Sequence, residues 1–301
     1  MAYFQKRDFE HAISEFEKLI KEFPDGTQEL QAAFYLANSL YNIDRYEDAL
    51  SIFKMIEKKG SEEFTMLARY QIGWCYYNMR KEAEAVLEFT KFLKDYPQSE
   101  MADNARFWFG GYYRSKGRYD KAKEYFSSIL TDYPSSDVAG DALFELALTL
   151  NDEGKAEEAI SHLIELAEKF PGSNFEKAAY KKIAKLKGAN SDYDSAIKYY
   201  RLALTNENNE SNAQLQYEIA ESFEKKGELL EATQEYLKVP YLYSKGVFWS
   251  IRSQLKCALA FERLEKWDEA KLVYEKLAGM DVEESKFAKE RLEWLRWRGT
   301  K

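Results

Sequence analysis

Apolar residues recur at helical spacing along nearly the whole chain. In the stretch 119–134, Ala122, Phe126 and Ile129 are spaced so that all three side chains lie on one face of a helix. A second apolar segment with the same periodicity ends just before Gly117. Because each segment is apolar on one face only, the pattern predicts two helices that pack against each other as an antiparallel pair.

This pattern is repeated. An alanine near the start of each second helix recurs every 36 to 38 residues, at Ala12, Ala49, Ala85, Ala122, Ala159, Ala196, Ala232 and Ala270. Twelve positions before each of the last seven stands a small residue, namely Ala37, Gly73, Gly110, Ala147, Ala184, Ala220 or Ala258. Antiparallel helices approach closely only where side chains are small, so these positions are predicted contact points. A single pair cannot bury its apolar face, so neighbouring pairs are expected to stack.

In spacing, small positions and turns, essentially the whole chain resembles the tetratricopeptide repeat. The usual period of that family is about 34 residues, and the extra residues here follow the helix-ending proline, as in Tyr96-Pro97-Gln98-Ser99. This longer variant resembles the repeats of bacterial envelope proteins, such as the Bam-complex lipoprotein and the Tol-Pal-associated coordinator. The resemblance implies an all-α fold, a right-handed α-solenoid of antiparallel helix pairs.

The repeat positions predict the organisation of the chain. We expect one array over residues 1–281, with about eight repeats, of which the first is partial (1–24) and repeats 2–8 span about 28–279. Residues 282–301 are expected to form a C-terminal capping helix and tail, because the last face of an array must meet water. The small position that should precede Ala12 would fall before residue 1. Either the native protein continues upstream or the array opens on an unpaired helix, and we favour the former.

Repeat seven departs from the pattern. Pro240 follows Ala232 by only eight residues, so the second helix of this repeat is expected to end early. The connector that follows is rich in rings: Tyr243, Phe248 and Trp249. These rings either pack over the shortened helix or form an exposed docking spot, since exposed apolar patches mark interaction sites. Trp294 and Trp297 leave a similar choice between closing the superhelix and contacting a partner.

Composition excludes several classes of function. A net charge of −8 and a pI near 5.2 argue against a nucleic-acid binder, which usually carries a basic surface. No apolar run approaches the roughly 18 residues of a membrane span, although a membrane anchor upstream stays open. Cys75 and Cys257 are predicted to be buried free thiols. The two histidines, His11 and His162, lie in no metal-ligand or nucleophile motif, so we expect neither a cofactor nor an enzyme.

The resemblance also implies where a partner would bind. In the family, first-helix residues at offsets −3, +1 and +4 from the small position face a concave groove. The residues selected in this way are Phe34, Asn38, Tyr41, Tyr70, Trp74, Tyr77, Phe107 and Arg114, with Lys181 and Lys185 as secondary candidates. An aromatic groove suits an extended or helical peptide with apolar anchors. The alternative is that these rings mainly fill the stack between neighbouring helices.

We therefore predict a non-catalytic scaffold that binds a peptide or helix of a protein partner in its concave groove. The resemblance favours bacterial envelope or complex assembly, with a periplasmic location preferred over a cytoplasmic one. One alternative is a cytosolic adaptor that docks a motor, secretion or chaperone component. Another is the non-catalytic part of a larger enzyme. The native N-terminus would discriminate among these three, whereas the partner and the oligomeric state are left open by the sequence.

Overall fold

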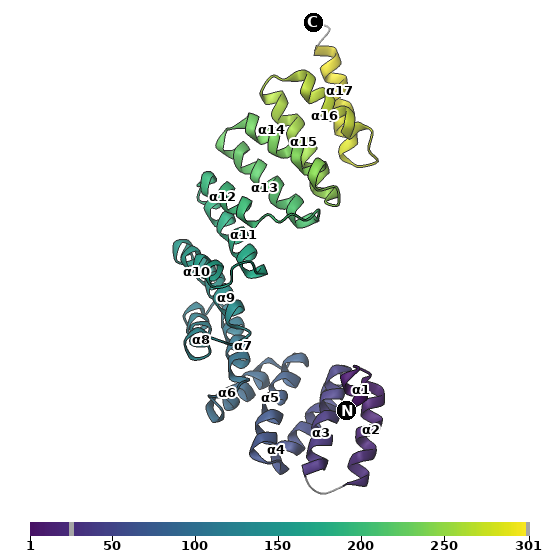
Figure 1. The fold of residues 1–301 in the computed structure, drawn as a ribbon, viewed down its shortest axis with the longest axis vertical. Coiled ribbons are helices and arrows are strands. Elements are labelled where there is room, and N and C mark those ends of the chain that lie inside the picture. Colours follow the sequence, from purple (N-terminus) through teal and green to yellow (C-terminus); the bar gives the residue numbers. More distant parts are fainter. Residues whose placement is uncertain (24–26, 299–301) are drawn as a thin grey trace. The chain divides into compact units, whose positions relative to one another are not determined.

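The computed structural model describes residues 1–23 and 27–298, and this part of the chain is all-α, as predicted (Figure 1). Consecutive helices pack in the expected pairs, as α3 does with α4, α7 with α8 and α15 with α16, and α17 follows the last of these pairs. In chain order they are α1 (Ala2–Gln5), α2 (Phe9–Glu22), α3 (Thr27–Asn42), α4 (Tyr46–Lys59), α5 (Glu62–Asn78), α6 (Glu82–Asp95), α7 (Ala102–Ser115), α8 (Tyr119–Asp132), α9 (Ala139–Asp152), α10 (Ala156–Lys169), α11 (Asn174–Ala189), α12 (Tyr193–Ala203), α13 (Glu210–Lys226), α14 (Leu229–Leu242), α15 (Val247–Arg263), α16 (Trp267–Ala278) and α17 (Glu284–Arg298).

The helices fall into two compact units. The first comprises residues 1–139 and contains α1 to α8, and the second begins at residue 140, within the first turn of α9. Within each unit, helices that follow one another in the chain pack side by side, as α4 does on α5 and α14 on α15. The segment predicted to cap the array contains α17, which buries Ala288, Leu292 and Leu295. Residues 299–301 of the predicted tail lie outside the described residues.

At the two small positions that are glycine, the helices of a pair are in close contact, as the repeat pattern predicts. A Cβ atom added to Gly110 would lie 2.4 Å from Cε1 of Phe126, and one added to Gly73 would lie 2.7 Å from Cε1 of Phe89. Each ring belongs to the second helix of the same pair and stands four residues after its alanine. Phe89 and Phe126 are completely buried. The ring of one helix therefore lies directly over the small residue of the other.

The prediction that Pro240 ends its helix early is wrong. α14 continues through Pro240 to Leu242 and has 14 residues, the same length as α8. Pro240 stands in the last turn, where its missing N–H removes one bond of the helix rather than several. The turn still closes beyond it, because the N–H of Tyr243 donates to the carbonyl of Val239 at 3.0 Å.

The shortened second helix is instead α12 in repeat six, which has 11 residues and ends at Ala203. The connector that follows is held by Asn212, whose side chain is almost fully buried. Its Oδ1 accepts from the backbone N–H of Thr205 at 3.1 Å, and its Nδ2 donates to the carbonyl of Glu207 at 2.7 Å. These bonds replace the missing helical turn, and α13 begins after Asn209, whose side chain caps it.

Two neighbouring glycines test the contact between ring and small residue. Gly110→Ala should lower the free energy of unfolding by about 1–3 kcal/mol, because the new methyl group overlaps the buried ring of Phe126. Gly111→Ala is the matched control, since a Cβ there meets nothing within 4 Å. It should leave stability unchanged or raise it by up to about 1 kcal/mol through a better helix propensity. Urea denaturation followed by circular dichroism measures both, and equal effects would contradict the assignment.

Candidate partner-binding site

An open pocket of about 450 Å³ lies in the first unit, on the first helices of repeats three and four. We call it the aromatic pocket. Its lining residues are Trp74, Tyr77, Glu82, Asn104, Phe107, Trp108, Gly111, Tyr112 and Ser115. The first two belong to α5, Glu82 begins α6, and the rest belong to α7. The α7 residues follow one another at steps of three, one, three, one and three, so they form a single helical face.

The walls of the aromatic pocket are rings in mutual contact. Trp108 and Tyr112 stack, with ring centroids 5.4 Å apart and planes 13° apart, and Tyr77 meets Trp108 edge-on at 5.9 Å. Behind them lies the buried ring of Phe89, 4.7 Å from Trp108 and 5.2 Å from Trp74. Because a core side chain supports both tryptophans from behind, the walls are held in place before any partner arrives.

The polar groups at the rim are engaged within the protein. The Glu82 carboxylate accepts from Nζ of Lys116 at 3.0 Å, and this bond raises the pKa of Lys116. Ser115 donates its hydroxyl to the carbonyl of Tyr112 at 2.7 Å, and Asn104 donates to Oδ1 of Asp103 at 3.2 Å. The aromatic pocket therefore offers apolar surface with a neutralised rim, which suits an apolar side chain better than a charged one.

Three of the predicted groove residues meet in the aromatic pocket: Trp74, Tyr77 and Phe107. Tyr77 is 41% exposed, whereas Phe107 also contacts the core ring of Phe126 at 5.7 Å. Tyr70 lies behind the pocket, half-buried against Phe92, and burial raises the pKa of its hydroxyl. The structure thus gathers part of the predicted set around one hollow, and binding by these residues stays a prediction.

The other predicted groove residues do not line the aromatic pocket. Phe34 packs edge-on against the core ring of Phe53 at 5.8 Å, and Asn38 donates its amide to the carbonyl of Phe34 at 2.8 Å. The hydroxyl of Tyr41 accepts from Asn78 at 2.6 Å, and burial raises its pKa to about 12. Arg114 is half-buried on α7.

Sequence reasoning missed Trp108 and Tyr112, which lie at the centre of the site. The groove offset of +1 from Gly110 falls on Gly111, but this residue was not selected as a partner-binding candidate. Trp108 stands two positions before Gly110, and Tyr112 stands two positions after it. Neither offset belongs to the family positions that face the groove. Gly111 could have indicated the site from the sequence. This glycine does not occupy a small contact position, and a Cβ added to it would meet open space, so the fold itself does not require it.

The secondary candidates on α11 belong to a polar surface of the second unit. Lys181 is half-buried and donates from Nζ to Oε1 of Gln214 at 3.1 Å, while Lys185 is exposed. Burial, and then the neighbouring charge of Lys185, lower the pKa of Lys181. On α13, burial and the nearby Glu221 raise the pKa of Glu218. Both ionised groups are therefore held in an environment that disfavours their charge.

The aromatic candidates of the second unit differ in exposure. Tyr243 is only 9% exposed and belongs to the core cluster, which excludes it from an exposed docking spot. Phe248 is 53% exposed, and Trp249 lies half-buried against Tyr217. The two C-terminal candidates, Trp294 and Trp297, are respectively half-buried on Trp267 and 60% exposed.

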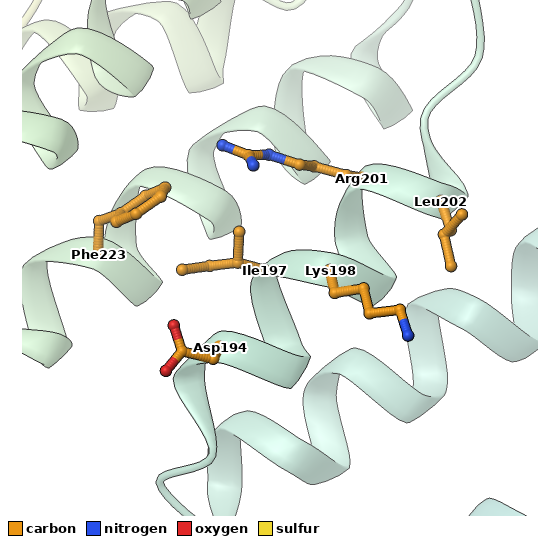
Figure 2. Close-up of a pocket in the computed structure, with 6 residues that line it drawn as sticks. All are labelled: Asp194, Ile197, Lys198, Arg201, Leu202 and Phe223. Atoms are coloured by element: carbon orange, nitrogen blue, oxygen red, sulfur yellow. The ribbon is translucent and has the colours of Figure 1, made fainter.

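A second hollow of about 480 Å³ lies on α12 (Figure 2). Figure 2 shows Ile197 and Arg201 of α12 facing Phe223 of α13. Two of its three charged side chains are paired within the chain, since Arg201 donates to Glu235 at 3.0 Å and Asp194 accepts from Lys226 at 2.6 Å. This hollow is lined by one ring, that of Phe223, whereas the aromatic pocket is lined by five, so it offers less aromatic surface to a partner.

Residues suited to chemistry are buried or dispersed. Cys75 and Cys257 are buried free thiols, as predicted, and burial raises the pKa of each to about 12. Within residues 1–23 and 27–298, no group of three His, Cys, Asp or Glu side chains could hold a metal ion. None of the helices in these ranges is long and apolar enough to cross a membrane.

Comparison with known proteins agrees with this architecture. The YfiO family, described as outer membrane lipoproteins, matches residues 60–208, and a tetratricopeptide repeat family matches residues 1–63 and 181–246. No curated protein sequence matches the chain.

Solved structures show the same fold. The C-terminal part of a tetratricopeptide repeat protein from Cytophaga hutchinsonii has a TM-score of 0.56 at 14% identity, covering 86% of this chain and 92% of its own. A tetratricopeptide repeat protein from Parabacteroides merdae has a TM-score of 0.50 at 15% identity, covering 94% and 99%. PilW, a type IV pilus biogenesis factor, has a TM-score of 0.50 at 16% identity, covering 72% and 94%.

These likenesses and the helix pairs define the class as an all-α protein built from repeated antiparallel helix pairs. The chain is a tetratricopeptide repeat protein. Families with this repeat are generally non-catalytic and serve as scaffolds for protein–protein interaction.

The half-buried Glu218 leads to a pH-dependent prediction. Its raised pKa means that it stabilises the fold only when protonated. That contribution is complete below its ordinary value of 4.5 and is lost as pH rises through the folded-state pKa. Glu218→Gln should therefore unfold at higher urea concentration than the wild type at about pH 7, and this advantage should disappear near about pH 4. The exposed Glu290 of α17 provides the control, since Glu290→Gln replaces a carboxylate that already faces water and should show neither effect.

Proposed function

We propose that this protein is a non-catalytic scaffold that holds an apolar anchor of a partner peptide or helix in the aromatic pocket. The observation that carries the proposal is an open cluster of rings, supported by the core, over a glycine that the fold does not need. Tryptophan and tyrosine side chains contribute most to binding energy at protein interfaces, above all where they form well-packed pockets.

The dimensions of the aromatic pocket support this assignment. Binding sites for small ligands and side-chain anchors occupy about 300–1,000 Å³, and this pocket has about 450 Å³. That volume accommodates a large aliphatic or aromatic side chain with its flanking backbone. The lining residues recur along one face of α7, so an elongated segment can lie along that face while its anchor enters the pocket.

Gly111 provides an independent argument. A glycine within a helix destabilises it by roughly 0.5–1 kcal/mol relative to alanine. At Gly110 this cost is offset by contact with Phe126, but an added Cβ at Gly111 would meet no atom of this chain. The space beside Gly111 is the floor of the aromatic pocket. A partner that approaches the backbone closely at this point explains a glycine that packing does not.

We further propose that the scaffold works in the assembly of bacterial envelope complexes. The match to a family of outer membrane lipoproteins covers residues 60–208 and therefore includes the whole aromatic pocket. Cell fractionation of the full-length protein tests the compartment separately from the binding site. Recovery in the cytosol would favour an adaptor role there and would leave the pocket assignment unchanged.

Binding can be tested with a phage-displayed library of random peptides of about 12 residues. Peptides selected on the wild type should share a large apolar residue. They should bind Gly111→Leu at least about tenfold more weakly, because the new side chain fills the pocket. Leu87→Ala, at an exposed position of α6, is the control and should retain wild-type affinity. Fluorescence polarisation with labelled peptides gives the affinities, and equal binding to Gly111→Leu would refute the pocket.

A further inference from the structure

One face of α14 carries three exposed apolar side chains in line. Leu230 is 42% exposed, Leu237 is 41% exposed and Tyr241 is 89% exposed. With the exposed Gln234 they follow one another at steps of four, three and four residues. This spacing keeps all four side chains on one face of the helix. We call these four residues the α14 seam.

The repeats of the chain provide an internal comparison. The three apolar positions of the α14 seam lie two residues before and five and nine residues after the repeat alanine. The corresponding residues are Asp194, Arg201 and Thr205 in the preceding repeat, and Asp268, Glu275 and Gly279 in the following one. No other second helix of the sequence is apolar at all three positions. The α14 seam is therefore specific to this repeat and is not a property of the repeat pattern.

The spacing and the flanking charges indicate what covers this face. Steps of four and three residues are those of a coiled-coil contact, in which two helices lie along each other. Glu231 follows Leu230, and Lys238 follows Leu237, so both charges stand on the same edge of the seam. When two identical helices pack antiparallel, this edge of one helix faces the same edge of the other, running in the opposite direction. Glu231 of each copy then lies opposite Lys238 of the other copy.

We propose that the α14 seam binds the α14 seam of a second copy of this chain in an antiparallel, two-fold symmetric contact. Leu230 of each copy then contacts Tyr241 of the other copy, and Gln234 of each copy contacts Leu237 of the other. The two-fold symmetry makes each of these contacts occur twice. A parallel arrangement would place Glu231 and Lys238 opposite Thr233 and Pro240, which carry no charge, so it forms no ion pair.

The side chains needed for this contact are available. Glu231 is exposed. Lys238 bonds Glu235 at 2.8 Å, but its side chain is 48% exposed. Glu235 also accepts from Gln216 at 2.6 Å and from Arg201 at 3.0 Å, so it keeps partners when Lys238 turns outward. This contact lies in the second unit and does not involve the aromatic pocket.

Sedimentation equilibrium of the full chain tests the proposal. A contact of one short helix per copy is at the small end of protein interfaces, so the wild type should pass from monomer to dimer between about 5 and 500 µM. Leu237→Gln should stay monomeric over this range. Leu87→Gln alters another exposed leucine of a second helix and should dimerise like the wild type. A monomeric wild type, or a Leu237→Gln variant that dimerises normally, would overturn the proposal.

Charge exchange tests the direction of the contact. Glu231→Lys alone should be monomeric, and so should Lys238→Glu, because each places like charges opposite each other. An equimolar mixture of the two should form a heterodimer, since every ion pair is then restored, and a folding defect could not produce this result. Circular dichroism checks both folds. If Lys238→Glu does not fold, loss of the dimer in both Glu231→Lys and Leu237→Gln supports the proposal, and a normal dimer in either variant overturns it. Binding of a monomeric wild type to phosphatidylglycerol vesicles through Leu237 would assign the seam to a lipid surface and would overturn the proposal.

Discussion

The helix pairs α5–α6 and α7–α8 depend on the contact between a buried ring on the second helix and the glycine that faces it on the first helix. The two first helices that line the aromatic pocket, α5 and α7, carry glycine at this position, and each glycine leaves room only for the ring it faces. Phe89 is the ring that lies against Gly73, and it also supports Trp74 and Trp108 from behind. The same buried side chain therefore joins the helix pair and holds the walls of the proposed site, so stability and recognition share one physical origin.

Much of the fold can be predicted because its determinants are local. The alanines, the small residues and the apolar faces recur at fixed spacing, so pairing and stacking follow from helical periodicity alone. The end of a helix is harder to place. Pro240 does not end α14 early, because it stands in the last turn and the hydrogen bond from Tyr243 to Val239 still forms after it. In contrast, α12 ends early because the side chain of Asn212 holds the connector that follows. These outcomes depend on a few hydrogen bonds that residue spacing does not reveal.

The candidate site could be predicted only in part. Of the residues selected from family positions, Trp74, Tyr77 and Phe107 line one hollow. Phe34 and Tyr41 were also selected, but their rings are largely engaged within the chain. Which rings stay exposed depends on how neighbouring helix pairs stack. This is a property of the tertiary structure, and the spacing of residues in the sequence does not reveal it. The two units also differ in chemistry. The first presents rings over glycine, whereas the second presents half-buried charges such as Lys181 and Glu218 and an apolar seam on α14.

Photo-crosslinking tests the central claim most directly, that the core-supported rings of α5 and α7 receive the partner. A library-selected peptide would carry benzophenone in place of its apolar anchor, and its attachment sites on the full chain would be mapped by mass spectrometry. We predict adducts on the residues around the aromatic pocket, chiefly Tyr77, Trp108 and Tyr112. Adducts confined to the second unit, with none on α5 or α7, would contradict it.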